Sequence, residues 1–148
     1  MSRLLFLIVF GFNISFAQTI DYNTKKGIAI DGYDVVAYFK NEAIEGKDQF
    51  TSKFDNVIYK FSSEKNRKAF ELNPKKYIPQ YGGYCAYAIA LKSDKVSIDP
   101  ETYLIKDGKL YLFYNSWGIN TLKSWKAKNQ EKLQQEADKN WDNIKFNK

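Results

Sequence analysis

The chain has 148 residues, 44% of them hydrophobic and 17% aromatic, which suits a single globular domain with one substantial core. The formal net charge is +6, but the lysines are scattered and often stand beside acidic residues. Without a dense basic run we expect no nucleic-acid partner. One cysteine and no histidine exclude an intramolecular disulfide and the usual four-ligand zinc site, so we expect no zinc. Hydrolytic triads lack their usual base for the same reason.

The first seventeen residues have the pattern of a secretory signal peptide. Arg3 gives a positive start, residues 4–12 are apolar, and Ser15-Phe16-Ala17 supplies small residues before a cleavage site. The apolar run is shorter than the roughly 20 residues that a membrane span needs, and no later segment approaches that length. We therefore predict a periplasmic or secreted protein without a membrane span, its single domain covering residues 18–148.

The first segment of the domain ends in a strongly apolar stretch. After a turn at Asp31-Gly32, residues 33–39 are rich in β-branched and aromatic side chains. Their periodicity does not distinguish a strand from a buried helix, and both interpretations stay open. Asp34 stands among these apolar residues, where a buried carboxylate requires a partner or water.

Two hairpins and a short helix are expected next. Residues 50–54 and 57–61 read as strands joined by Asp55-Asn56. Ser62 and Ser63 are suited to cap a surface helix over residues 64–72. Farther along, Asp107-Gly108 between β-rich runs at 103–106 and 109–114 is typical of a two-residue type I′ turn.

The C-terminal region has helical periodicity from Asn120 onwards. Apolar residues recur near a 3.6-residue spacing and include Trp125 and Trp141, with Asn129 interrupting the pattern. We predict one long amphipathic helix that packs both tryptophans on the domain. The fold class is thus α+β: a small antiparallel sheet, a short surface helix and a long C-terminal amphipathic helix.

The stretch 77–90 between these regions concentrates unusual residues. Pro79 ends the preceding helical turn, and Gly82-Gly83 allows positive φ or a close backbone approach. Tyr84 and Cys85, the lone cysteine, follow directly. Tyr81, Tyr84 and Tyr87 stand three residues apart, a spacing compatible with a shared face that lines a pocket for a small aromatic or apolar ligand. Plain core packing explains the same spacing.

Several motifs occur in the order expected for a known family. They are the runs 31–39 (DGYDVVAYF), 59–63 (YKFSS) with Asn66, Arg67 and Phe70, 73–77 (NPKKY), 79–86 (PQYGGYCA), 107–112 (DGKLYL) and 137–141 (ADKNW). Together they resemble the YHS domain family, and in particular its exported bacterial single-domain branch. The similarity covers essentially the whole chain after residue 17.

The resemblance implies a link to metal handling, because relatives occur beside copper-transporting ATPases and in some monooxygenases. There, one cysteine directly follows the aromatic strand and another follows four residues later. The matching positions here are Ser62 and Asn66, which are not soft ligands, and the family's name-giving histidine is missing. The relatives' metal site therefore does not transfer, and capping or hydrogen bonding explains both residues better.

Two interpretations of Cys85 remain. It is either a small buried core residue or a functional thiol, which includes a ligand for a soft ion such as Cu(I). We predict an exported YHS-like binding domain rather than an enzyme, binding copper or another soft metal through Cys85. The alternative is a domain that binds a protein or small ligand without metal, with Cys85 in the core. Its partner would be a small ligand, a metal ion or an exported protein. The candidate ligand-binding residues are Tyr81, Gly82, Gly83, Tyr84 and Asp34.

Overall fold

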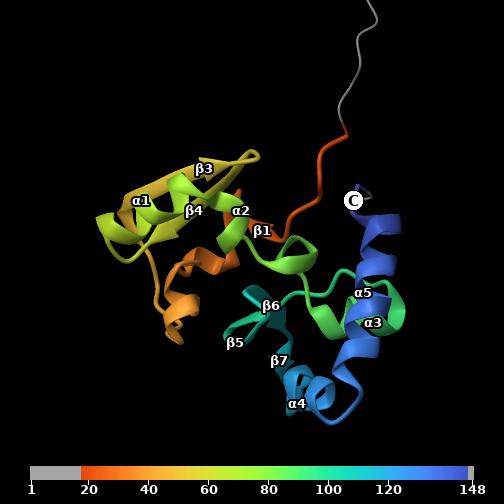
Figure 1. Ribbon diagram of the computed structural model, residues 1–148. Coiled ribbons are helices and arrows are strands. Elements are labelled where there is room, and N and C mark those ends of the chain that lie inside the picture. Colours follow the sequence, from red (N-terminus) through yellow and green to blue (C-terminus); the bar gives the residue numbers. More distant parts are fainter. Residues whose placement is uncertain (1–17, 147–148) are drawn as a thin grey trace, which may run out of the picture.

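The structure is a computed structural model that describes residues 18–146. The predicted signal peptide and its cleavage site after Ala17 lie outside the described residues. The strands are β1 (Thr24–Lys25), β2 (Ile28–Ala29), β3 (Lys47–Phe54), β4 (Val57–Phe61), β5 (Asp99–Lys106), β6 (Lys109–Phe113), β7 (Asn115–Ser116) and β8 (Ile119–Asn120). The α-helices are α1 (Glu64–Leu72), α2 (Pro74–Tyr77), α3 (Ala86–Lys92), α4 (Thr121–Lys126) and α5 (Gln130–Ile144). This arrangement confirms the predicted α+β class (Figure 1).

The largest sheet has the strand order β1-β2-β4-β3. Strands β3 and β4 form the predicted antiparallel hairpin, whose turn residues Asp55 and Asn56 have φ values of 53° and 64°. Positive φ at both positions is the geometry of a type I′ turn. The sheet is mixed rather than purely antiparallel, because Ile28 of β2 pairs in parallel with Ile58 of β4.

The second predicted hairpin is also present. Strands β5 and β6 pair through a turn at Asp107-Gly108, with φ values of 51° and 69°. Strand β5 begins at Asp99, earlier than the predicted start at Tyr103, and its pairing is irregular between these two residues. Pro100 falls within this irregularity, where no regular ladder hydrogen bond is needed.

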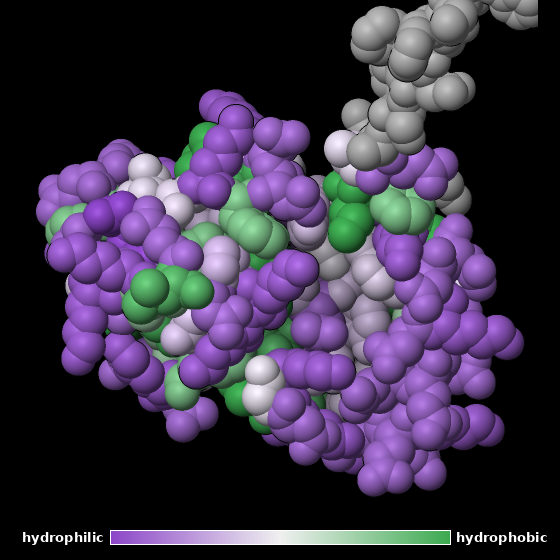
Figure 2. All heavy atoms as spheres, turned by 45° about the horizontal axis from the view of Figure 1, so that its top comes forward, coloured by the Kyte–Doolittle hydropathy of each residue, from purple (hydrophilic) through white to green (hydrophobic). Residues whose placement is uncertain are grey.

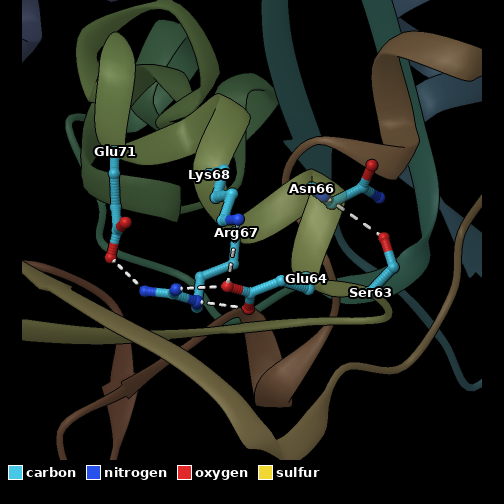
Figure 3. A network of polar contacts seen from close by, with 6 residues as sticks. All are labelled: Ser63, Glu64, Asn66, Arg67, Lys68 and Glu71. Carbon is cyan, nitrogen blue, oxygen red and sulfur yellow. Dashed lines mark hydrogen bonds and ion pairs between the residues drawn. The ribbon is translucent and has the colours of Figure 1, made fainter.

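Helix α1 is held by local polar contacts and confirms the predicted cap (Figure 3). The Ser63 hydroxyl accepts a hydrogen bond from the Asn66 backbone N–H at 3.2 Å. Arg67 donates to Glu64 one turn before it, Nε to Oε2 at 2.7 Å, and to Glu71 one turn after it, Nη1 to Oε1 at 2.6 Å. These pairs lie on the outer face, and Phe70 is fully buried on the inner face.

The predicted long C-terminal amphipathic helix is present as α5, but it is preceded by a separate helix, α4, so the prediction of one continuous helix from Asn120 onwards was wrong. Helix α4 ends at Lys126, and α5 begins at Gln130 after a short break. Asn129 causes the new start, because its side chain accepts a hydrogen bond from the Lys132 backbone N–H at 3.0 Å. Trp125 on α4 is buried, and Trp141 on α5 is half-buried.

The buried apolar side chains form two clusters, and Tyr81 of the glycine turn (residues 81–83) belongs to the second. The first, around Tyr38, Phe61 and Phe70, lies beneath the large sheet and α1. The second, around Tyr111 and Trp125, is closed by α3 and α5 (Figure 1). Within residues 18–146, no helix has the length and apolar character needed to cross a membrane.

Candidate ligand-binding groove at the glycine turn

The glycine turn has an unusual backbone. Tyr81, Gly82 and Gly83 have φ values of 54°, 60° and 83°, so three successive residues lie in the left-handed region. The sequence predicted this freedom for the glycines, which adopt positive φ at no steric cost. It did not predict it for Tyr81, where a bulky side chain makes the conformation cost roughly 1–2 kcal/mol.

Tyr81 is fixed in this conformation by contacts with α5 and β6. Its hydroxyl donates a hydrogen bond to Asp138 Oδ1 at 2.8 Å. Its ring lies 6.0 Å from that of Tyr111 and 6.5 Å from that of Trp141, measured between centroids. Burial, and then the hydrogen bond to the Asp138 carboxylate, raises the pKa of Tyr81 far above its ordinary value. Tyr81 is therefore a neutral hydrogen-bond donor at any physiological pH.

Gly82 brings the N-terminal arm (residues 18–23) and α5 into direct contact with the turn. Its carbonyl accepts a hydrogen bond from the Asn23 backbone N–H at 2.9 Å. A Cβ atom at Gly82 would lie 2.8 Å from the Asp21 carbonyl oxygen and 2.8 Å from Trp141 Cη2. Gly83 is joined to the same arm, since its carbonyl accepts from Asn23 Nδ2 at 3.0 Å. These contacts require glycine at position 82.

An open groove of about 720 Å³ runs along this turn. The space-filling surface is hollowed between its two halves, and hydrophilic side chains cover much of the surrounding face (Figure 2). The groove combines aromatic and aliphatic surface with acids, amides and lysines. Its lining comprises Ile20, Tyr22, Phe54, Asp55, Lys75, Ile78, Pro79, Gln80, Tyr81, Gly82, Lys109, Asp138, Trp141 and Asp142.

Two of the groove's carboxylates are oriented by tyrosines. The Tyr22 hydroxyl donates to Asp55 Oδ2 at 2.6 Å, in the same way that Tyr81 donates to Asp138. Because a carboxylate accepts several hydrogen bonds, each aspartate keeps acceptor capacity for a ligand. Of these four residues, sequence reasoning singled out only Tyr81 as a site residue. The others come from distant segments, and although Asp55 lies in a predicted turn and Asp138 in the motif 137–141, nothing local relates either of them to the groove.

The three regularly spaced tyrosines do not share one pocket. Tyr81 lines the groove and Tyr87 lines a separate pocket beside Cys85. Tyr84 lies between them, and its hydroxyl donates to Asp21 Oδ2 at 3.0 Å. Burial, followed by this hydrogen bond, raises the pKa of Tyr84 to about 12. Tyr84 therefore fastens the N-terminal arm instead of lining the groove.

Cys85 is fully buried. Its Sγ accepts a hydrogen bond from the Tyr114 backbone N–H at 3.4 Å and lies 3.3 Å from Thr121 Oγ1. It also borders a pocket of about 230 Å³, lined mainly by apolar side chains of α3 and its surroundings.

The surroundings of Cys85 do not fit a copper site. The thiol's two polar neighbours are a hydroxyl and an N–H donor, neither of which is a soft ligand. In the part of the chain that the structure describes, no group of three or more Cys, Asp or Glu residues is placed to hold a metal ion.

Asp34 belongs to a different site, in the first core. Its buried carboxylate accepts from the Val36 and Ala37 backbone N–H groups and from the Ser62 backbone N–H at 2.9, 3.2 and 2.8 Å. Ser62 Oγ and Asn66 Nδ2 each donate to Asp34 Oδ2 at 2.7 Å. The bonds to Val36 and Ala37 turn the chain, so residues 33–39 form neither a strand nor an α-helix, and a short 3-10 helix covers Ala37–Lys40. Asp34 does not join the groove.

The same network explains Ser62 and Asn66, for which the sequence predicted capping or hydrogen bonding. Both direct a donor group at Asp34, and Asn66 Oδ1 in turn accepts from Lys40 Nζ at 2.8 Å. The predicted hydrogen-bonding role of the two residues is confirmed. Their arrangement gives Asp34 a structural role, since every contact satisfies a buried polar group.

Comparison of the chain with protein-family models, curated proteins and solved structures finds no significant match. The resemblance to the YHS family therefore stays a prediction from the motifs.

The buried Cys85 thiol should be unreactive in the folded protein. We expect a bulky aromatic disulfide reagent to modify it only after unfolding in urea, because the side chain has no exposed surface. Cys85→Ser should lower the free energy of unfolding by about 1–3 kcal/mol. Stoichiometric modification of native protein, with protection by Cu(I), would instead support a metal ligand.

Proposed function

We propose that this protein is a binding domain, not an enzyme, and that the groove at the glycine turn binds a small neutral saccharide. The observation that carries the proposal is Tyr81, a bulky residue held at positive φ where it lines the groove of about 720 Å³. Strained residues of this kind persist when the surrounding structure fixes them, and they concentrate at ligand sites. Here Asp138 and Trp141 of α5 supply that fixation.

The chemistry of the groove favours a sugar over a charged ligand. Aromatic rings such as those of Tyr22 and Trp141 offer apolar surface for the C–H faces of a sugar ring. Oriented carboxylates and the Gln80 amide suit the hydroxyl groups around its edge. Acids and lysines both line the groove, so neither sign of charge dominates it.

Binding of a soft metal through Cys85, the other function inferred from the sequence, has less support. The thiol is buried among a hydroxyl, a backbone N–H and apolar side chains. The groove, in contrast, presents several polar groups around a space of ligand size.

Titration calorimetry with glucose, N-acetylglucosamine and cellobiose tests the proposal. We expect at least one sugar to bind, and Gln80→Ala and Lys75→Gln each to weaken it about five- to tenfold through the loss of one hydrogen bond. Lys76→Gln is the matched control, because Lys76 is the next lysine along the chain and is exposed but does not line the groove. Absence of binding, or equal losses in Lys75→Gln and Lys76→Gln, would refute it.

A further inference from the structure

A short hairpin at the edge of the molecule exposes a tryptophan to solvent. Strands β7 and β8 pair through Asn115↔Asn120 and Ser116↔Ile119, and Trp117-Gly118 forms the turn between them. Trp117 is 93% exposed and Ile119 57% exposed. We call residues 115–120 the Trp117 finger. In Figure 1 its first strand, β7, lies beside α4.

The backbone conformation at the tip of the finger is unfavourable for tryptophan. Trp117 has a φ of 53° and Gly118 a φ of 75°. The first turn position is suited to asparagine, aspartate or glycine. Of the three other two-residue hairpin turns in the described residues, two carry aspartate there, and the β1–β2 turn carries Lys26, with a φ of 52°. A large aromatic residue at that position is strained, and its exposed ring gains no burial in return. Neither folding nor solubility accounts for a tryptophan here.

The finger is firmly attached to the domain at its base. The Thr121 backbone N–H donates to the Tyr114 carbonyl at 3.0 Å, and Thr121 Oγ1 donates to the same oxygen at 2.9 Å. Asn120 then caps α4 by accepting from the Lys123 backbone N–H at 3.1 Å. The tip is thus presented by a fixed base, which keeps low the entropy lost when it engages a partner.

The charge next to the finger is basic on the α4 side. Lys123, Lys126 and Lys128 are all exposed on or just after that helix. On the opposite side, Asp99 is bound at the base of the finger, where Asn115 Nδ2 donates to its Oδ2 at 3.3 Å. An exposed tryptophan and isoleucine beside three lysines are the combination that binds an anionic lipid surface.

We propose that the Trp117 finger inserts into the interface of an anionic lipid bilayer, with the lysines of α4 contacting the headgroups. A lipid surface fits better than a protein partner. The apolar residues form a narrow projecting tip with polar Asn115, Ser116 and Asn120 around its base, whereas protein interfaces centre on broader, well-packed apolar patches. This inference is independent of the groove.

Quenching of tryptophan fluorescence by vesicles with brominated acyl chains tests the inference. Trp125 is buried and Trp141 half-buried, so quenching reports mainly on Trp117. We expect quenching by phosphatidylcholine vesicles that contain phosphatidylglycerol and little by phosphatidylcholine alone. Combining Lys123→Gln with Lys126→Gln should weaken partitioning about 25-fold, roughly fivefold for each lysine.

Two variants separate membrane binding from loss of fold. Because Trp117→Gly also removes the fluorescent reporter, its binding is measured by co-sedimentation with the same vesicles. It should abolish co-sedimentation with the anionic vesicles and keep or raise the melting temperature, because glycine adopts positive φ without strain. Leu72→Ser removes a comparably exposed apolar side chain, 89% exposed at the end of α1, and should leave partitioning unchanged. Co-sedimentation of Trp117→Gly at the wild-type level, or no quenching of the wild type by either kind of vesicle, would overturn the proposal, and the second result would favour a protein partner.

Discussion

Asp34→Ala should lower the free energy of unfolding by about 3–5 kcal/mol, the largest effect that we expect from a single substitution. The carboxylate accepts hydrogen bonds from three backbone N–H groups and from the side chains of Ser62 and Asn66. Alanine would leave these buried donors without an acceptor and open a cavity beside them. Urea unfolding followed by circular dichroism measures the change.

Two further substitutions, one intermediate variant and one control, are needed to interpret the Asp34→Ala result. Asp34→Asn keeps one acceptor oxygen and should fall between wild type and alanine. Asp48→Ala removes an exposed aspartate that forms a surface ion pair with Lys60, and should leave stability nearly unchanged. An unfolding free energy for Asp34→Ala within error of wild type would show that the network does not hold the first core together.

Gly82→Ala should also destabilise the fold strongly, by about 3–4 kcal/mol. Alanine would have to adopt the positive φ of Gly82, and its Cβ would lie 2.8 Å from both the Asp21 carbonyl oxygen and the Trp141 ring. Relief of these contacts requires movement of α5 away from the turn, so we expect a change in Trp141 fluorescence as well. Thermal unfolding and emission spectra test both parts.

Gly108→Ala provides the matched control for backbone strain. Gly108 has a φ of 69°, close to that of Gly82, and no atom lies within 4 Å of the position that a Cβ would take. Gly108→Ala should lower the free energy of unfolding by only about 1–2 kcal/mol, from strain in the left-handed region. If both variants lost equal stability, close packing at Gly82 would contribute nothing beyond its φ.

Local chemistry allowed much of the fold to be predicted from the sequence. The Asp55-Asn56 and Asp107-Gly108 turns and the Ser63 cap depend on neighbouring residues, so their signals are contained in short segments. The predicted start of the C-terminal helix was wrong, because Asn129, which interrupts the apolar pattern, accepts a capping bond and starts a new helix there. The parallel β2–β4 pair joins distant segments, and nothing local to Ile28 specifies it.

The candidate site was only partly predictable, because it joins segments that are distant in the sequence. Gly82-Gly83 marked the turn, but the groove also needs Asp138 and Trp141, more than fifty residues away in the sequence, and no motif links them to the turn. Asp34 was expected to need a partner, and the structure supplies Ser62 and Asn66. Its distance from the turn depends on tertiary packing, which no spacing in the sequence reveals.

Mapping of amide chemical shifts during titrations with glucose, N-acetylglucosamine and cellobiose tests the central claim most directly, and at least one of the three sugars should give the response. We predict saturable shifts confined to the groove, at Gln80, Tyr81, Gly82 and Asp138, with the amides of Cys85 and Tyr114 unchanged. Gly108→Ala should keep this response, because its position lies outside the groove lining. Shifts that centre on Cys85 and Tyr114, or no saturable shifts at the glycine turn, would contradict the assignment of the groove as the binding site.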